Sequence, residues 1–368
     1  MSARRRIMVV IGTRPEAIKM APLVLALREQ PWADVRVLAT AQHRQMLDQV
    51  LDVFGIVPDI DLDIMQPGQA LTTLTARLLL KLDDVLKDER PDIVLLQGDT
   101  TTVMSVALAC FYHRIPIGHV EAGLRTGDLD NPFPEEMNRI VAGRLARWHF
   151  APTATSRDNL LREGFAPEQV FVTGNTVIDA LQQVAGRDLD LGVDVDPDKR
   201  LVLVTAHRRE NFGEPFRAIC RAIRELADTN PDTAFLYPVH PNPNILEPAR
   251  ELLSGHPRIT LCAPLDYLPF VAAMKRAHVI LTDSGGVQEE APALGKPVLV
   301  LRHETERPEA VDAGVVKLVG TDHGAIVAET NRLLRDGAAW RAMARGVSPY
   351  GDGRACARIV GHLAAGLA

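Results

Sequence analysis

Short, continuous runs of apolar residues alternate with longer stretches of helical periodicity through almost the entire chain. A continuous apolar run bounded by turn residues is typical of a parallel strand covered on both faces. In the first half we expect strands at Ile7–Ile11, Val35–Thr40, Ile93–Gln97, Pro116–Val120 and Trp148–Ala151. The helical patterns between them cover about Pro15–Glu29, Arg44–Phe54, Ala70–Asp88 and Thr100–His113. This rhythm predicts a doubly wound α/β domain.

The same rhythm restarts in the second half. Here we expect strands at Leu201–Ala206, Ala234–Val239, Ile259–Cys262, Val279–Thr282, Pro297–Leu301 and Val315–Val319. We place the boundary near 173–176 (TGNT), which gives a first domain at 1–172 and a second at 173–353. Ligands of such sheets bind at the carboxyl ends of the strands, so two facing domains predict a site in an interdomain cleft.

Composition excludes several classes of protein. The net charge of −6 and an aromatic content of 5% argue against binding to nucleic acid or to an anionic membrane. The 4 cysteines stand far apart with no CxxC pair, which suits a reducing compartment and gives no zinc-site spacing. The longest nearly apolar run, 103–112, is too short to span a bilayer. We therefore expect a soluble cytoplasmic protein without a metal site.

The first predicted strand leads into the sequence GTRPEAIK, residues 12–19. Gly12 allows close approach of the backbone, and Pro15 suits the first turn of a helix. Arg14 and Lys19 would then lie near a helix N-terminus, which is a natural site for an anion. The alternative is a capped turn with solvated cations. The chain has neither GxGxxG after this strand nor a Walker loop, so no dinucleotide site is indicated.

Carboxylates follow the next predicted strand ends. Asp99 comes after Ile93–Gln97, Glu121 comes after Pro116–Val120, and Glu135 follows a long loop. Carboxylates gathered at adjacent strand ends can hold one another's pKa values apart, as acid–base chemistry requires. Two simpler interpretations remain: Asp99 could cap the following helix, and acidic residues are common at helix starts.

In the second half, basic and glycine-rich segments occupy the strand ends. His207 and Arg208 follow one strand, and the sequence DSGGVQEE, residues 283–290, follows another. A Ser-Gly-Gly turn opening a helix aims backbone N–H groups at a phosphate, and Glu290 could accept hydrogen bonds from ribose hydroxyls. A basic surface loop and an ordinary turn are the alternatives. We interpret the segment as a nucleotide site.

Eleven longer segments of the chain together carry a resemblance to one protein family. The segments GTRPEAIKMAPL, TAQHRQMLDQV, QGDTTTV, GHVEAGLRTGD, PFPEEMNR, TGNTVIDAL, HRREN, YPVHPNPN, LTDSGGVQEEAP, LGKPVLV and ERPEAV closely resemble the bacterial non-hydrolysing UDP-N-acetylglucosamine 2-epimerases. The resemblance runs from about Ile7 to Gly353. It implies a GT-B fold, in which two Rossmann-like domains face each other across a cleft and a C-terminal helix, 354–368, crosses back onto the first domain.

The resemblance also implies an activity. Members interconvert UDP-GlcNAc and UDP-ManNAc without NAD or an obligatory metal, usually as homodimers, and supply ManNAc units for surface polysaccharide. They eliminate UDP in the anti sense to give 2-acetamidoglucal, and UDP then adds back. C2 is not adjacent to a carbonyl, so without redox chemistry its proton becomes removable only as UDP departs.

The matching positions fall into three groups. Those that match the family's catalytic residues are Asp99, Glu121, Glu135 and His207, with the base at C2 left open among the carboxylates. Those that match substrate-binding residues are Arg14, Lys19, Phe270, Ser284, Gly285, Gly286, Glu290 and Arg307. Those that match a regulatory UDP-GlcNAc pocket of several bacterial members are Gln42, Gln45, Arg208 and His240. Gly68 stands where some regulated members carry Arg, which weakens the parallel.

Other functions compete with this interpretation. A GT-B glycosyltransferase shares the fold, a hydrolysing epimerase would release free ManNAc, and a nucleotide-sugar sensor would bind without turnover. A sensor leaves the carboxylates unexplained. The substrate could also be a modified UDP-GlcNAc derivative.

Overall fold

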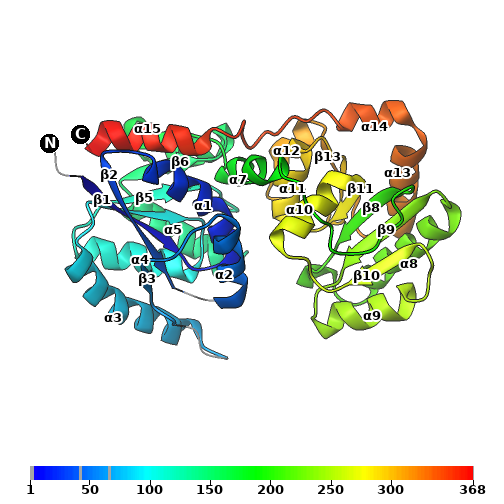
Figure 1. Cartoon of the computed structure of the whole chain (residues 1–368), viewed down its shortest axis with the longest axis horizontal. Coiled ribbons are helices and arrows are strands. Elements are labelled where there is room, and N and C mark those ends of the chain that lie inside the picture. Colours follow the sequence, from blue (N-terminus) through cyan, green and yellow to red (C-terminus); the bar gives the residue numbers. More distant parts are fainter. Residues whose placement is uncertain (1–3, 41–43, 65–67, 368) are drawn as a thin grey trace. The chain divides into compact units, whose positions relative to one another are not determined.

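The chain divides into two units, each built on its own parallel sheet (Figure 1). The computed structural model describes residues 4–40, 44–64 and 68–367. The first unit comprises Met1–Gln183 and Tyr350–Ala368, and the second comprises Val184–Pro349. In the described residues, no helix combines the length and the apolar character needed to cross a bilayer.

The sheet of the first unit has seven strands in the order β3-β2-β1-β4-β5-β6-β7, all parallel. The strands are β1 (Arg5–Ile11), β2 (Ala33–Ala39), β3 (Ile60–Asp61), β4 (Ile93–Gln97), β5 (Ile117–Val120), β6 (Trp148–Ala151) and β7 (Val170–Val172). The helices are α1 (Arg14–Arg28), α2 (Arg44–Val53), α3 (Leu71–Glu89), α4 (Thr101–Tyr112), α5 (Glu135–Leu145), α6 (Ala154–Arg162), α7 (Thr176–Ala185) and α15 (Ala355–Leu367).

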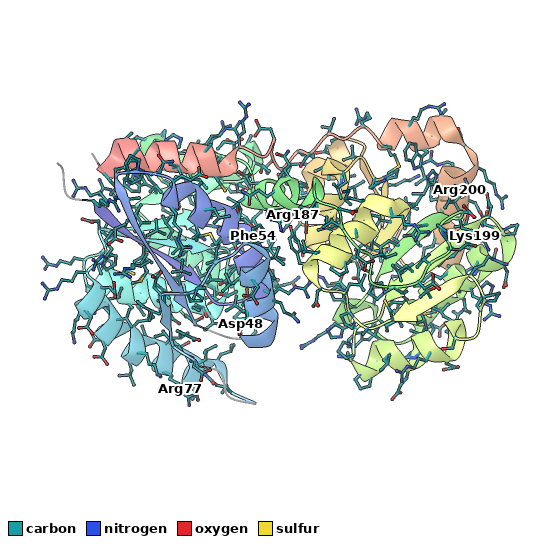
Figure 2. The ribbon with its side chains drawn as sticks, viewed as in Figure 1. Asp48, Phe54, Arg77, Arg187, Lys199 and Arg200 are labelled. Carbon is teal, nitrogen blue, oxygen red and sulfur yellow. The ribbon has the colours of Figure 1, made fainter. Side chains whose placement is uncertain are left out.

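Apolar periodicity explains how these helices cover the sheet. Helix α3 buries Leu74, Leu78, Leu82 and Leu86, which recur every four residues and form one stripe along the helix. This stripe packs into one core with Met8 and with other buried residues of β1 and β4. All five residues of β4 are buried, as a central parallel strand requires. Arg77 of α3, labelled in Figure 2, donates to the backbone oxygen of Ile64 at 3.1 Å.

The sheet of the second unit has six parallel strands in the order β10-β9-β8-β11-β12-β13. The strands are β8 (Arg200–Thr205), β9 (Thr233–Pro238), β10 (Ile259–Cys262), β11 (Ala277–Thr282), β12 (Val298–Val300) and β13 (Val316–Leu318). The helices are α8 (Glu214–Thr229), α9 (Pro243–Leu253), α10 (Tyr267–Arg276), α11 (Gly285–Ala293), α12 (Pro308–Asp312), α13 (His323–Arg335) and α14 (Gly337–Met343). Arg200, labelled in Figure 2, begins β8. Its guanidinium group pairs with the carboxylate of Asp232.

The division between the units falls after Gln183, later than the boundary that we expected from sequence at 172/173. The physical reason lies in α7. The carboxylate of Asp179 on this helix accepts the backbone N–H groups of Ala355 and Cys356 at 3.2 and 2.9 Å, and so caps α15. Helix α15, red in Figure 1, also contacts α1. Most of α7 thereby belongs with the first unit.

The two sheets share one topological feature that positions functional groups. In each, the first strand of the unit is central and pairs with the fourth: β1 with β4, and β8 with β11. Such a point, where the strand order reverses, opens a crevice at the carboxyl ends of the strands. The predicted fold class, α/β with two parallel sheets, is therefore confirmed.

Candidate active site

The turn after β1 brings its backbone unusually close to neighbouring side chains. A Cβ atom on Gly12 would lie 2.8 Å from Oγ1 of Thr40, so no larger residue fits without movement. Thr13 caps α1 and forms a capping box with Glu16. Arg14 then starts the helix, partly exposed at its N-terminal end. The sequence-based interpretation of this turn as a tight approach is consistent with this geometry.

Glu16 is a buried carboxyl that ties two strand ends together. Its Oε2 accepts the backbone N–H of Gly12 at 2.5 Å and of Thr13 at 3.3 Å, and its Oε1 accepts the hydroxyl of Thr100, after β4, at 2.8 Å. Burial raises the pKa of Glu16 to about 7, although these hydrogen bonds oppose the rise; the nearby Asp99 adds to it.

Asp99 lies at the end of β4 and is held from α5. Its Oδ2 is 2.6 Å from a guanidinium nitrogen of Arg139, and its backbone oxygen accepts the side-chain amide of Asn138 at 2.9 Å. The helix cap is Thr100, which accepts the N–H of Val103. The alternative in which Asp99 itself caps α4 is therefore excluded. The Asp99 carboxylate is partly exposed, and Arg139 holds it in position.

Glu121 lies at the end of β5, the neighbour of β4. Its Oε2 is 2.5 Å from Nζ of Lys19 and 2.9 Å from the side-chain nitrogen of Gln97, and Asn175 approaches it at 3.4 Å. Its φ of +61° lies in the left-handed region, which a residue with a Cβ rarely adopts. Such strain persists where the surroundings fix a side chain and is common at active sites.

Glu135 begins α5 and is partly exposed, whereas its neighbour Glu136 is fully buried. Glu136 accepts the backbone N–H groups of Thr126 and Gly127, both at 3.1 Å, and pairs with Arg139 at 3.1 Å. Glu136 thus anchors the long loop that precedes α5. Glu135, the first residue of the helix, is not used for this anchoring in the part of the chain that the structure describes.

In the second unit, His207 follows β8 and Asp283 follows β11. The carboxylate of Asp283 accepts the backbone N–H groups of His207 and Arg208, both at 2.8 Å. The imidazole rings of His207 and His240 are stacked, with centroids 5.7 Å apart. Partial burial lowers the pKa of His207, the charge of Asp283 opposes this, and Arg208 and His240 add to it.

The Ser-Gly-Gly turn opens α11, as expected, with Ser284 as its N-cap. A Cβ atom on Gly285 would lie 3.8 Å from guanidinium nitrogens of both Arg208 and Arg307, so two cations flank the helix start. Arg307 is itself oriented by a side-chain pair with the buried Glu289. Backbone N–H groups at a helix N-terminus next to two cations are an arrangement that attracts phosphate groups, so the expected diphosphate site remains a candidate.

The remaining predicted residues are placed as follows. Gly286 is in the first turn of α11, and a Cβ there would lie 3.7 Å from the carboxylate of Glu290, which is buried. Phe270 is half-buried on α10. Of the expected regulatory residues, Arg208 and His240 flank His207. Gln42 lies outside the described residues. The backbone of Gln45 belongs to α2, and its side chain is not among those that the structure describes.

The structure adds residues to which sequence reasoning gave no role. Glu16 bonds to the turns that carry Arg14 and Asp99. Asn138 and Arg139 bond to Asp99 itself, and Asp283 accepts the backbone N–H of His207. The capping-box spacing from Thr13 to Glu16 was a signal that could have identified the first of these. Among the described residues, no group of three or more His, Cys, Asp or Glu side chains is arranged to hold a metal ion.

The chain is similar to known proteins over nearly its whole length. The family model described as UDP-N-acetylglucosamine 2-epimerase matches residues 25–364. The chain is 56% identical to the UDP-N-acetylglucosamine 2-epimerase of Escherichia coli K12, across 96% of this chain and 97% of that one. A crystal structure of UDP-GlcNAc 2-epimerase from Neisseria meningitidis bound to UDP-GlcNAc superposes with a TM-score of 0.90 at 47% identity, covering 98% and 100% of the two chains. A glycosyltransferase of kitacinnamycin, 13% identical with a TM-score of 0.66, covering 99% of this chain and 100% of that chain, shares the fold alone.

Proposed function

The chain belongs to the UDP-N-acetylglucosamine 2-epimerase family and is an enzyme of that activity, and from this premise we propose the route by which its residues act. UDP-GlcNAc is converted reversibly into UDP-ManNAc by anti elimination and re-addition of UDP. The GT-B fold, shared with a glycosyltransferase, suits a nucleotide sugar. The Neisseria relative bound to UDP-GlcNAc supports the same substrate here.

The proposed elimination is balanced as follows. A carboxylate takes the proton from C2, the C2–H electron pair forms the C1–C2 double bond, and the C1–O bond to UDP breaks. The products are 2-acetamidoglucal and UDP, both retained. In the reverse direction a phosphate oxygen of UDP attacks C1, and C2 accepts a proton on the opposite face, which gives the epimer.

One observation carries this proposal: the carboxylates of Asp99 and Glu121, at the ends of adjacent strands, are each held by a cation. Arg139 lies 2.6 Å from Asp99, and Lys19 lies 2.5 Å from Glu121. A cation beside a carboxylate holds it in a fixed orientation, as a base for C–H abstraction requires. Glu135 completes the set of proposed proton-transfer groups.

We assign the UDP moiety to the second unit. Ser284, Gly285 and Gly286 would bind the diphosphate through the N-terminus of α11, with Arg307 beside them. Glu290 would bind the ribose and Phe270 would lie near the uracil. His207 would assist departure of the leaving group. Arg14 and Lys19 would bind substrate from the first unit.

We also propose regulation by UDP-GlcNAc at a second pocket that includes Gln42, Gln45, Arg208 and His240. In the structure, Arg208 and His240 adjoin His207, so a ligand there would touch the same catalytic group. Pure UDP-ManNAc should then react slowly until a trace of UDP-GlcNAc is added. Full activity from the start would overturn this assignment.

We propose that the enzyme is a homodimer. Leu80 of α3 and the pair Phe111 and Tyr112 at the end of α4 are strongly exposed, and α3 and α4 pack against each other. Large exposed apolar side chains on adjoining helices are typical of an interface. Sedimentation should give the dimer mass for the native chain, and a native monomer would refute the proposal.

Two further proposals concern where the enzyme works in the cell and how its product is used. We propose that the enzyme works in the cytoplasm, where its four cysteines, which are free thiols in the structure, would stay reduced. We propose further that its product supplies ManNAc units for surface polysaccharide. Deletion of the gene should then remove ManNAc from the polymer, and unchanged polymer would exclude this role.

Incubation with UDP-GlcNAc in D₂O, followed by proton NMR, tests the reaction. UDP-ManNAc with deuterium at C2 and no free ManNAc is the expected result. Free ManNAc with UDP would identify a hydrolysing enzyme instead. No turnover without an added acceptor sugar would favour a glycosyltransferase, and turnover of only modified sugars would move the substrate to a UDP-GlcNAc derivative.

A further inference from the structure

Among the described residues, all the hydrogen bonds to the carboxylate of Asp283 are made to one of its two oxygens. This residue is fully buried, and its Oδ2 accepts three hydrogen bonds: from the backbone N–H of His207 and of Arg208 at 2.8 Å each, and from the side chain of Asn211 at 3.2 Å. Three donors on one oxygen hold the carboxyl plane in a fixed direction. The position of the second oxygen is therefore set by the fold.

That second oxygen, Oδ1, is buried and makes no hydrogen bond among the described residues. It lies 3.5 Å from Nδ1 of His207, whose side chain is 40% exposed. Leaving a buried carboxylate oxygen without a donor is costly, so its direction toward an imidazole nitrogen calls for a function. The separation is slightly longer than a hydrogen bond, as is common for catalytic pairs before a ligand is bound.

We propose that Asp283 is the positioning residue of His207: it accepts the Nδ1–H of the imidazole and leaves Nε2 directed to the leaving diphosphate. This deepens the proposed function, because it rests on the role given there to His207. A carboxylate behind an imidazole fixes the tautomer and stabilises the imidazolium form. The next residue after Asp283 is Ser284 of the diphosphate turn, so one short segment places both groups.

The proton transfer is balanced within this pair. At elimination, Nε2–H of the imidazolium gives its proton to the departing phosphate oxygen as the C1–O bond breaks, and His207 becomes neutral while keeping Nδ1–H. At re-addition the proton returns to Nε2. Asp283 stays ionised throughout.

The other charges facing His207 explain why a carboxylate is needed. Arg208 and His240 both disfavour a positive charge on the ring, as does its partial burial, and Asp283 acts in the opposite sense. Without Asp283 the imidazolium would lose its opposing charge. The acid form that the leaving group requires would then be confined to lower pH.

The substitution Asp283→Asn separates this role from a purely structural one. The amide oxygen can still accept the backbone N–H groups of His207 and Arg208, so the turn keeps its hydrogen bonds. The amide NH₂ then occupies the position of Oδ1 and donates to Nδ1, which forces the ring proton onto Nε2. The variant therefore keeps the backbone hydrogen bonds of the turn and reverses the tautomer of His207.

Nitrogen-15 NMR of labelled histidine in the full chain measures the tautomer directly, and the His207 signal is assigned by its loss in His207→Gln. We expect Nδ1–H in the native protein and Nε2–H in Asp283→Asn. We also expect kcat to fall about 10²- to 10⁴-fold and its pH profile to move to lower pH. UDP affinity should change less than about threefold, which is within about 0.7 kcal/mol.

Asn211→Ala is the matched control, because it removes a donor to the same carboxylate but leaves Oδ1 and the charge in place. It should keep the native tautomer and pH profile. An Nε2–H tautomer in the native protein, or equal changes in both variants, would overturn the proposal. If instead the tautomers are as expected but His207→Gln is fully active, the pairing holds and the proposed role of His207 fails.

Discussion

Both units join the ends of their first and fourth strands with a buried carboxylate. The two carboxylates differ in how many of their oxygens accept hydrogen bonds from the surrounding turns. In the first unit, Glu16 reaches from the turn after β1 to Thr100 after β4, and both its oxygens accept hydrogen bonds. In the second unit, Asp283 reaches from β11 back to the turn after β8, and all three donors meet one oxygen. A carboxylate satisfied by its own turn can only join strands, whereas a spare oxygen can act on a further group.

Side-chain length and position explain this difference. Glu16 lies in the first turn of α1, and its longer side chain folds back over the N-terminus, where donors surround it. Asp283 follows its strand directly, so its short side chain reaches the neighbouring turn with one edge only. The same topology thereby yields a structural link in one unit and, in our proposal, a positioning group in the other.

The strand ends also differ in charge. In the first unit they present carboxylates, Asp99 and Glu121, each backed by a cation. In the second unit they present backbone N–H groups and the cations Arg208 and Arg307. We infer that proton transfer at C2 belongs to the first set, and that diphosphate binding, with the leaving-group proton of His207, belongs to the second.

The largest effect should come from Asp99→Asn, which tests this division directly. The amide keeps the size of the side chain but cannot act as a base, so we expect kcat to fall about 10²- to 10⁴-fold. UDP affinity, measured by calorimetry, should be unchanged because the nucleotide is assigned to the second unit. Asp88→Asn, at an exposed position of α3, is the control for loss of one charge. Equal losses of UDP affinity and kcat would contradict the division.

Sequence could predict the strands with long apolar runs. The expected ranges Ile93–Gln97, Trp148–Ala151 and Ile259–Cys262 are those of β4, β6 and β10. Burial on both faces demands uninterrupted apolar residues, so the signal is local. The two-residue strand β3, Ile60–Asp61, carries no such run, and pairing with β2 alone defines it.

The candidate site was predictable only in part. A charged residue after a buried strand marks a strand end, which is how Asp99 and Glu121 were found. What that residue does depends on partners far along the chain: Arg139 lies 40 positions from Asp99, and Lys19 lies 102 positions from Glu121. No periodicity encodes such pairs. For the same reason, choosing between cap and functional carboxylate at Asp99 needed the structure.

A second test concerns the structural carboxylate and uses the pH dependence of stability. The carboxyl of Glu16 titrates near 4.5 when exposed and at about 7 in the fold. Between these values the unfolded chain has lost the proton and the folded chain keeps it, so the free energy of unfolding falls as pH rises. The fall is about 1.4 kcal/mol per pH unit, roughly 3 kcal/mol in all.

Glu16→Gln should abolish that fall, because the amide does not titrate and can still accept the N–H of Gly12. Hydrogen exchange of the β1 and β4 amides, corrected for intrinsic rates, measures opening of this unit alone. The stability of the variant relative to the native chain should rise from pH 4.5 to pH 7. Glu29→Gln, exposed beyond the other end of α1, should show no such trend. A flat difference for Glu16→Gln would show that this carboxyl is not perturbed.

The smallest effect is expected from Gly285→Ala, which tests the turn that Asp283 precedes. A Cβ at this position meets no atom closer than 3.8 Å, so the fold accepts it, and alanine suits a helix better than glycine. A diphosphate approaching the N–H groups between Arg208 and Arg307 would meet the new methyl group. UDP affinity should therefore fall about tenfold, or about 1.4 kcal/mol, while stability is unchanged or slightly raised.

Gly361→Ala on α15, where a Cβ meets nothing within 4 Å, is the control: it should affect stability similarly and leave UDP affinity unchanged. Equal UDP affinity in both variants would remove the turn from the binding site, and with it the contrast between a first unit that moves the C2 proton and a second unit that binds the diphosphate.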